Sequence, residues 1–275
     1  MTDKVLVRVA DDGNATVMLN RPEVHNAFDP EMVEGLTVAL NELDGDAGVR
    51  AVVLLGAGPS FCAGADIVHM KKSATYSPKQ NHGAALAMAN MLYRLHAMKK
   101  PTIACIRGAV RGGGCGLVAA CDVAIAGRTA TFQLSEVKLG IIPAMISPYV
   151  IAAMGARMAN RFMITGEEFD AAEAYRIGFV HDICEEDDLT AKVGQILGQL
   201  YTSGPQAIAA VKKLIPLSEH ASITREIVEE TSRRIAGIRA TPEAQEGLSA
   251  FLEKRKTAWS TPPAKTSKRP ARRKK

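Results

Sequence analysis

Three successive glycines, residues 112–114, lie where the chain passes from a strand to a helix. They follow an apolar, strand-like run at 102–106 and precede a helix-like run at 117–121. Glycine at such a corner leaves the backbone open to a ligand, and the first turn of a helix points unpaired N–H groups at negative charge. The corner therefore favours an α/β fold with an anion-accepting site at the start of a helix.

The first two hundred residues alternate short apolar runs with helical patterns. Apolar and polar residues alternate on both sides of Gly13, which predicts a hairpin. The continuous apolar run at 51–55 predicts a buried strand, and Asp29 followed by Pro30 marks the start of a helix. We expect helices at 30–43 and 84–98, and further strands at 102–106, 123–126 and 131–133.

Beyond about residue 142 we expect helices and no strands, because apolar residues recur there with helical spacing between Gly, Pro and Ser. The expected helices cover 156–164, 171–177 after Asp170, 189–201, 205–215, 223–235 and 242–256. We therefore divide the chain into an α/β core at 1–200, a helical region at 201–259 and a tail at 260–275. Terminal helices of this kind cover a core or carry subunit contacts.

The formal net charge of +5 comes from the tail. The last fifteen residues contain seven Lys or Arg, three prolines and no acidic residue. Removing these seven from the 34 basic residues leaves 27 against 29 acidic ones, so the rest of the chain is close to neutral. Because the tail lacks apolar residues to bury, we expect it to be disordered.

Several classes of protein are excluded by composition and motifs. No apolar run approaches the roughly 20 residues of a membrane helix, and a strand pattern at the N-terminus leaves no room for a signal peptide, so we expect a cytoplasmic protein. The glycine run fails the dinucleotide pattern because Leu117 occupies its last position, and no Gly-Lys pair exists for a P-loop. The cysteines and histidines lack CxxC and metal-ligand spacing, so we expect reduced thiols and no metal site.

A second loop and one acidic residue complete a candidate site. The loop at 60–67 follows the strand expected at 51–55. If it faces the loop at 111–116, one backbone N–H from each can bind a developing oxyanion, and each such donor is typically worth about 3–4 kcal/mol. A single glycine loop is more often a tight turn. Glu136, in an otherwise apolar segment, adds a candidate general acid or base, which together points to chemistry on a carbonyl such as a thioester.

Ordered motifs over residues 3–259 resemble the enoyl-CoA hydratase/isomerase, or crotonase, superfamily. The motifs are LNRP at 19–22 with Asn26-Ala27, FCAGAD at 61–66, GGGC at 112–115 through ACD at 120–122, SEVKLGIIP at 135–143, TG at 165–166, AAEA at 171–174, GFV at 178–180, EG at 246–247 and AFLEKRK at 250–256. Each motif alone is weak, and their ordered succession makes the resemblance specific.

The resemblance implies a spiral of ββα units with a C-terminal helical region that forms a trimer or a dimer of trimers. It implies that the N–H groups of Ala65 and Gly113 hold the thioester oxygen of an acyl-CoA substrate and that Glu136 moves protons. It implies no metal and no cofactor beyond the CoA part of the substrate. The CoA contacts that it implies, of which the last two are often offered to a neighbouring subunit, are Val24, Ala63, Asp66, Ile67, Phe251 and Lys254.

Gly116 departs from the family's pattern, because the best-known hydratases have a second glutamate there. With Glu136 alone the chain can be a hydratase whose one carboxyl both activates water and protonates C2, or an isomerase that carries a proton from C2 to C4. The segment at 143–149 resembles a bacterial branch assigned to 3-methylglutaconyl-CoA or related branched glutaconyl-CoA hydration. The alternative interpretation is that the sequence of this pocket wall has changed while the substrate has stayed the same. We expect a hydratase, with the isomerase as the alternative.

The basic tail allows one alternative that is not an enzyme. A scaffold of this family could hold nucleic acid through Lys and Arg side chains that contact phosphates. Such a tail more often only aids solubility. We therefore expect an enzyme without a nucleic-acid or membrane partner.

Overall fold

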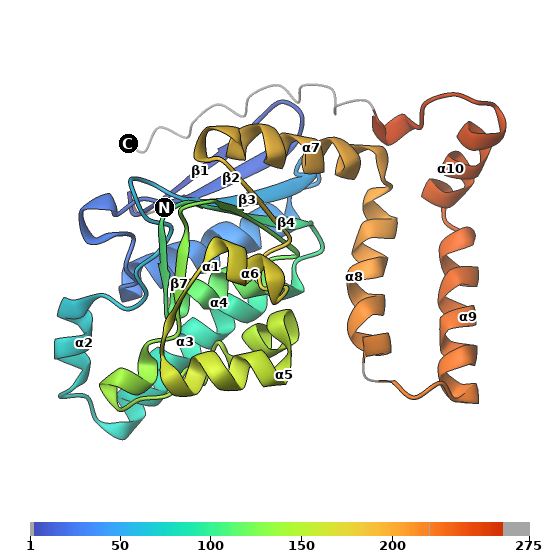
Figure 1. Ribbon diagram of the computed structural model, residues 1–275. Helices are drawn as coiled ribbons and strands as arrows, with labels where there is room; N and C mark the ends of the chain where they lie inside the picture. Colours follow the sequence, from blue (N-terminus) through green and yellow to red (C-terminus); the bar gives the residue numbers. More distant parts are fainter. Residues whose placement is uncertain (1–2, 220, 261–275) are drawn as a thin grey trace, which may run out of the picture.

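An N-terminal hairpin and four further strands form the larger of two sheets in the computed structural model, which describes residues 3–219 and 221–260 (Figure 1). The strand order is β1-β2-β3-β4-β6-β9. β1 runs antiparallel to β2, and the other neighbours are parallel. The strands are β1 (Val5–Val9), β2 (Asn14–Leu19), β3 (Ala51–Gly56), β4 (Thr102–Ile106), β6 (Val123–Gly127) and β9 (Asp182–Cys184).

A smaller sheet carries the chain into and out of the glycine corner. β5 (Ala109–Arg111) pairs in parallel with β7 (Thr131–Gln133), and β7 pairs antiparallel with β8 (Glu168–Asp170). Because β5 and β7 are parallel, the chain leaves both strands at the same edge. The residues that follow 111 therefore emerge beside those that follow 133.

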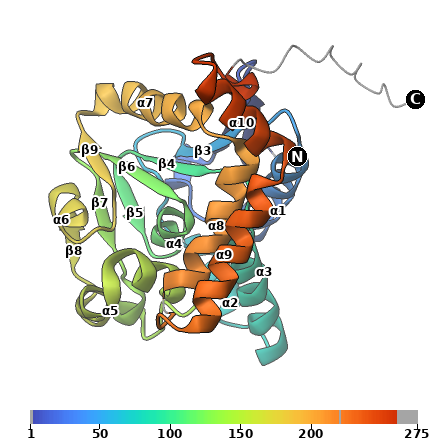
Figure 2. The ribbon, with the colours of Figure 1, turned by 90° about the vertical axis from the view of Figure 1, so that its right-hand side faces the viewer.

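The helices surround the two sheets on several sides (Figures 1 and 2). In the described residues they are α1 (Pro30–Gly45), α2 (Ile67–Ser73), α3 (Pro78–Ala97), α4 (Gly113–Ala120), α5 (Ser147–Thr165), α6 (Ala171–Arg176), α7 (Leu189–Thr202), α8 (Pro205–Glu219), α9 (Arg225–Arg239) and α10 (Pro242–Leu252). The expected caps are confirmed: the Asp29 carboxylate accepts from the Met32 N–H, and that of Asp170 accepts from the Glu173 N–H.

The larger sheet is buried on both faces, as its continuous apolar strands predict. Val52 and Leu54 of β3 contribute to the main cluster, which also contains buried residues of α1, α3, α4 and α5. Val53 of β3 belongs to a second cluster on the opposite face, together with residues of α7. This two-sided burial holds the ends of the parallel strands, and the loops that leave them, in fixed positions.

Beyond residue 142 the expectation of helices alone is wrong. β8 and β9 are strands of three residues each, too short to show the alternation that marks a strand in a sequence. β9 extends the larger sheet beside β6, and β8 extends the smaller one beside β7. The last expected helix ends at Leu252 rather than at 256, since Lys254 has φ of 54°, outside the helical region.

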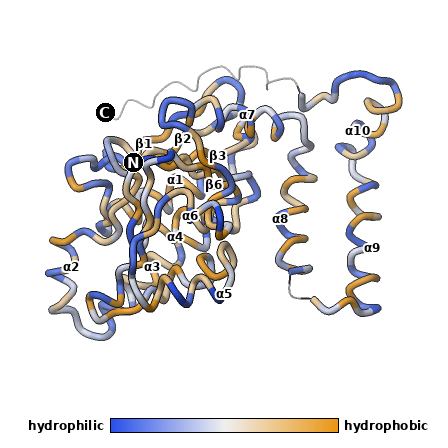
Figure 3. Tube along the Cα trace, in the orientation of Figure 1, coloured by the Kyte–Doolittle hydropathy of each residue, from blue (hydrophilic) through white to orange (hydrophobic). Residues whose placement is uncertain are grey.

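α8 and α9 form an arm outside the body of the molecule (Figure 1). Neither helix has a buried residue among those described, although apolar residues recur along both (Figure 3). α7, in contrast, packs on the larger sheet. The change in packing falls between α7 and α8, near the predicted boundary at residue 200, and the division into domains stays a prediction.

None of the described helices combines the length and the hydropathy that a membrane crossing requires. The tail for which we expect disorder lies outside the described residues, except for Ser260. The two sheets and the helices around them confirm the expected α/β class, and the glycine corner lies at the start of α4 as predicted.

Candidate functional site

Two loops meet at the candidate site. Cys62 and Val110 form an isolated parallel bridge. The Cys62 N–H donates to the Ala109 carbonyl at 3.2 Å, and the Arg111 N–H donates to the Cys62 carbonyl at 2.9 Å. These bonds tie the loop at 60–67 to β5, which leads directly into the glycine run.

Gly64 permits the closest approach of the two loops. A methyl group on this residue would lie 2.8 Å from the Arg111 oxygen and 3.7 Å from the Gly113 nitrogen, and its φ of +83° disfavours other residues. Glycine at this position therefore lets the backbone at Ala65 lie beside the backbone at Gly113.

Ala65 presents its N–H to the side opposite Phe28. Phe28 donates its N–H to the Gly64 carbonyl at 2.7 Å and accepts from the Asp66 N–H at 2.9 Å. These two bonds form a parallel bridge between Phe28 and Ala65, in which Ala65 lies between the two residues that bond to Phe28. In such a bridge the middle residue points its own N–H away from the partner segment. Within the described part of the chain that N–H has no hydrogen-bond acceptor, and Ala65 is exposed.

Gly113 supplies a second free donor. It is the first residue of α4, where a helix has no acceptor of its own for the N–H. Gly112 precedes it with φ of 46° and ψ of −116° and gives its N–H to the Gln133 carbonyl at 2.9 Å. Among the described residues, none accepts from the Gly113 N–H. Two unpaired donors, one from each loop, thus lie at one place.

Glu136 lies against the same corner. It begins the short 3-10 helix η2 (Glu136–Leu139) just after β7, so the parallel pairing of β5 and β7 brings it beside the glycine run. A methyl group on Gly112 would be 3.0 Å from the Glu136 Oε1 atom. The Oε2 atom is buried and has no partner among the described residues. Burial raises the pKa of the Glu136 carboxyl, although its own backbone N–H acts in the opposite direction.

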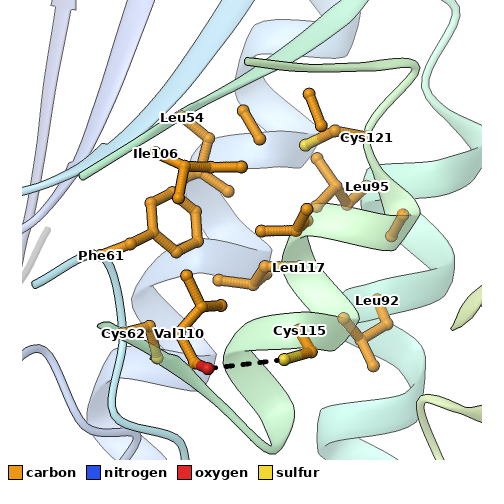
Figure 4. Packing of buried hydrophobic residues seen from close by; sticks show 14 of the residues in the cluster. Leu54, Phe61, Cys62, Leu92, Leu95, Ile106, Val110, Cys115, Leu117 and Cys121 are labelled. Atoms are coloured by element: carbon orange, nitrogen blue, oxygen red, sulfur yellow. Dashed lines mark hydrogen bonds between the residues drawn. The ribbon is translucent and has the colours of Figure 1, made fainter. Parts of the chain in front are cut away.

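The core fixes the start of α4. Cys115 and Leu117 point into a cluster that includes Leu92 and Val110 (Figure 4). The Cys115 thiol lies 3.6 Å from the Val110 carbonyl, and burial raises the pKa of this thiol to about 12. It is therefore a neutral packing group, and the helix start that carries the Gly113 donor is held by apolar contacts.

Asn26 connects the first loop to the N-terminal segment. Its buried side chain donates to the carbonyls of Ala57 and Ser60, both at 2.8 Å, and accepts from the Arg21 N–H at 2.8 Å. Its φ of 58° is in the left-handed region, which Asn tolerates better than most residues. Asn26 thus ties the N-terminal segment to the chain that leads into the Ala65 loop.

We expect Asn26→Ala to lower the free energy of unfolding by about 3 kcal/mol, because it leaves three backbone groups, one buried and two partly buried, without their partners. Chemical denaturation measures the change. Asn20→Ala is the matched control, since the Asn20 amide makes one exposed bond, to the Asp3 carbonyl, and its loss should cost less than about 0.5 kcal/mol. Equal stability of the two variants would contradict the assigned role.

Asp66 is occupied by bonds within the protein. Its carboxylate accepts from the N–H groups of Val68 and His69, which caps α2, and from the Arg21 guanidinium at 2.8 Å. Burial alone would raise the pKa of Asp66, but the His69 N–H, Arg21 and the Val68 N–H lower it below its ordinary value. A contribution of Asp66 to CoA binding would thus come through the shape of the loop.

The other residues of the predicted CoA site divide into two places. Val24 and Ala63 are half-buried beside the first loop, where the Ala63 N–H donates to the His25 carbonyl at 2.9 Å, and Ile67 is exposed at the start of α2. Phe251 is in the last turn of α10 and Lys254 follows this helix, which lies on the opposite side of the molecule from α2 (Figure 1). Within one chain the structure does not bring these two to the site, because the arm carries them away from the body. Phe251 is 80% exposed and can be offered to a neighbouring subunit.

Sequence reasoning gave no role to Arg21 or to Ile146. The guanidinium of Arg21 also donates to the Ala27 carbonyl at 2.7 Å, so with its bond to Asp66 it links the N-terminal segment to the Ala65 loop. Ile146 fills the space beside Gly116. The available signals were the LNRP motif and the unusual segment at 143–149, but neither shows which distant residue is the partner.

Comparisons with known proteins place the chain among enoyl-CoA hydratases and isomerases. The sequence profile of the enoyl-CoA hydratase/isomerase family matches residues 10–262. The short-chain-enoyl-CoA hydratase of Clostridium acetobutylicum is 32% identical over 88% of this chain and 92% of its own length, and the crotonyl-CoA hydratase of Syntrophomonas wolfei is 32% identical over the same shares.

Solved structures have the same fold. An enoyl-CoA hydratase from Shewanella pealeana is 41% identical, with a TM-score of 0.90 over 93% of this chain and 96% of that one. An enoyl-CoA hydratase/isomerase from Marinobacter aquaeolei is 32% identical, with a TM-score of 0.89 over 94% and 100%. With two free N–H donors and one carboxyl at a single corner, the chain belongs to the enoyl-CoA hydratase/isomerase family.

Proposed function

We propose that this protein is a hydratase that adds water across the 2,3 double bond of an acyl-CoA. The observation that carries the proposal is the meeting of three groups at one corner: the unpaired N–H groups of Ala65 and Gly113, and the half-buried carboxyl of Glu136. The hydratases among its relatives support the same reaction. The reaction needs no cofactor beyond the CoA part of the substrate.

The proposed mechanism uses one carboxyl for both proton transfers. The Glu136 carboxylate accepts a proton from water while the water oxygen bonds to C3. The electron pair of the double bond moves through C2 to the thioester oxygen, whose negative charge the Ala65 and Gly113 N–H groups stabilise. The enolate then collapses and C2 takes the proton from Glu136, so that one water is added and the carboxylate is regenerated. Burial of Glu136 assists the first transfer, because a raised carboxyl pKa makes the carboxylate a stronger base toward water.

An isomerase is the second candidate, and Gly116 is the observation that favours it. Moving a double bond from the 3,4 to the 2,3 position requires one group that takes a proton from C2 and gives it to C4. Glu136 can do this through the same enolate, with the same two N–H donors. Neither a bound water nor a second carboxyl is needed.

The resemblance of segment 143–149 supports 3-methylglutaconyl-CoA, or a related branched glutaconyl-CoA, as the substrate. In the structure Pro143 is buried, and Pro148 lies in the first turn of α5. Both prolines restrict this segment, which packs near α4 through Ile146. The segment on which the proposed substrate rests is thus conformationally restricted and packs near the site.

Mass spectrometry of a small enoyl-CoA panel in ¹⁸O-labelled water tests the proposed function. The panel includes crotonyl-CoA, 3-methylglutaconyl-CoA and the 3-enoyl isomer of crotonyl-CoA. A hydratase gives a product heavier by one labelled water, and the preferred substrate identifies the acyl class. Relocation of the double bond without a gain in mass would replace the hydratase by the isomerase. No conversion of any member would contradict both.

We also propose that the arm of α8 and α9 forms subunit contacts in a trimer or a dimer of trimers. The support is its exposed apolar residues, among them Val211, Ile215, Val228 and Ile235, each at least half exposed in the single chain. Light scattering after size exclusion should give three or six times the chain mass of 29.3 kDa. A monomer at micromolar concentration would contradict the proposal.

A further inference from the structure

Gly116 faces a side chain that already fills its side-chain space. It lies in α4 three residues after the Gly113 donor, and α4 packs against α5. A methyl group on Gly116 would lie 2.3 Å from Cγ2 and 3.0 Å from Cβ of Ile146, and 3.4 Å from Cδ1 of Leu92. Carbon atoms in ordinary contact are about 3.5–4 Å apart, so no side chain at 116 fits while Ile146 keeps its position.

Ile146 is fixed by the backbone around it. It is 2% exposed, and its carbonyl accepts from the N–H groups of Tyr149 and Val150 at 3.1 and 3.0 Å, in the first turn of α5. The Ser147 N–H donates to the Pro143 carbonyl at 3.0 Å, which closes the preceding turn. Displacing Ile146 would require its side chain to leave its rotamer or α5 to shift.

We propose that Ile146 is a specificity-determining residue of this site: it excludes an acid–base side chain at position 116 of α4, and so sets the balance between water addition and double-bond relocation. The inference rests on the proposed function and deepens it. It explains why residue 116 is a glycine, whereas the sequence shows only that a glutamate is absent at this position.

The position of Gly116 relative to the donor carries this argument. Residues three apart in a helix share a face, so a carboxyl at 116 would project from the same side of α4 as Gly113. Ile146 replaces that carboxyl by apolar surface, which offers no hydrogen bond to water. Water addition then depends on the one water that Glu136 can hold, whereas relocation of a double bond uses Glu136 without water. An apolar wall here therefore disfavours water addition relative to relocation.

Four proteins test this inference: the wild type, Gly116→Glu, Ile146→Ala and the double variant Gly116→Glu/Ile146→Ala. Melting temperatures, and the rates of crotonyl-CoA hydration and of 3-enoyl to 2-enoyl relocation, are measured for each. We expect Gly116→Glu alone to lower the melting temperature by about 5 °C or more and to slow both reactions. The double variant should recover most of that loss, because Ile146→Ala removes Cγ2, the atom that lies closest to a side chain at position 116.

The readout specific to function is the ratio of hydration to relocation. We expect it to be about 10-fold higher or more in the double variant than in Ile146→Ala, with a second ionisation in the pH profile of hydration. A side chain with a merely structural role would not move this ratio. Ile151→Ala, also on α5 but at an isoleucine 41% exposed, is the matched control and should not rescue Gly116→Glu.

Two results would overturn the inference. One is a Gly116→Glu protein as stable as the wild type with Ile146 intact. The other is a double variant whose ratio of hydration to relocation equals that of Ile146→Ala. Wild-type protein that converts no member of the enoyl-CoA panel would instead overturn the proposed function, and the melting temperatures would still decide whether Ile146 blocks position 116.

Discussion

Glu136→Gln is expected to lower kcat by about 10²- to 10⁴-fold while the fold stays intact, because Gln cannot take or return a proton. The structure places this carboxyl against Gly112 with one buried oxygen that has no partner among the described residues. Steady-state kinetics with crotonyl-CoA and circular dichroism together check the result. Glu42→Gln, at an exposed position of α1, is the matched control and should retain wild-type kcat.

The pH dependence gives a second readout of the same group. Burial raises the pKa of Glu136, so kcat/KM for hydration should fall with decreasing pH at a pH above the ordinary range of a glutamate. A raised pKa in the folded state means that the stability contributed by this group is present at low pH and is lost as pH rises through the folded-state value. Glu136→Gln removes the ionisation, so at neutral pH the variant should be at least as stable as the wild type. A loss of stability, or an active variant, would contradict the assignment.

Gly113→Pro should lower kcat by about 10²- to 10³-fold relative to Gly113→Ala, because proline lacks the N–H that we assign to the oxyanion. Proline suits the first position of a helix, where that N–H makes no helical bond. In both variants the added Cβ would lie about 3.1 Å from Cε of Met88 and about 3.3 Å from Cε2 of Phe28. The alanine variant therefore controls for the added Cβ.

The assignment of Gly113 would be contradicted if the two variants had equal kcat. A lost donor acts on the transition state and lowers kcat, whereas a blocked pocket weakens the binding of any acyl-CoA. We therefore expect the affinity for a saturated acyl-CoA, measured by calorimetry, to differ between the variants much less than kcat does.

The parts of the fold that could be predicted are those with strong local signals. The run at 51–55 is apolar throughout because β3 is buried on both faces. Asp29 and Asp170 predict the starts of helices because their side chains cap the first turns. β8 and β9 were missed because three residues are too few for a periodic pattern. Their places in the sheets depend on partners 35 or more residues earlier in the chain.

The candidate site was accessible to sequence reasoning only in its separate pieces. The glycine run and Glu136 could each be recognised, but their meeting depends on the parallel pairing of β5 with β7. Gly116 and the segment around Ile146 both looked unusual, yet nothing local shows that the two residues are in contact. Asn26 gives the same lesson, since two of its partners lie about thirty residues later, where the chain enters the Ala65 loop.

A crystal structure of Glu136→Gln with bound crotonyl-CoA tests the central claim most directly. The account predicts the thioester oxygen within about 2.7–3.1 Å of the backbone nitrogens of both Ala65 and Gly113, with the side chain at 136 facing C2 and C3. An oxygen held by other groups, or an acyl chain that does not pass the side chain at 136, would contradict it.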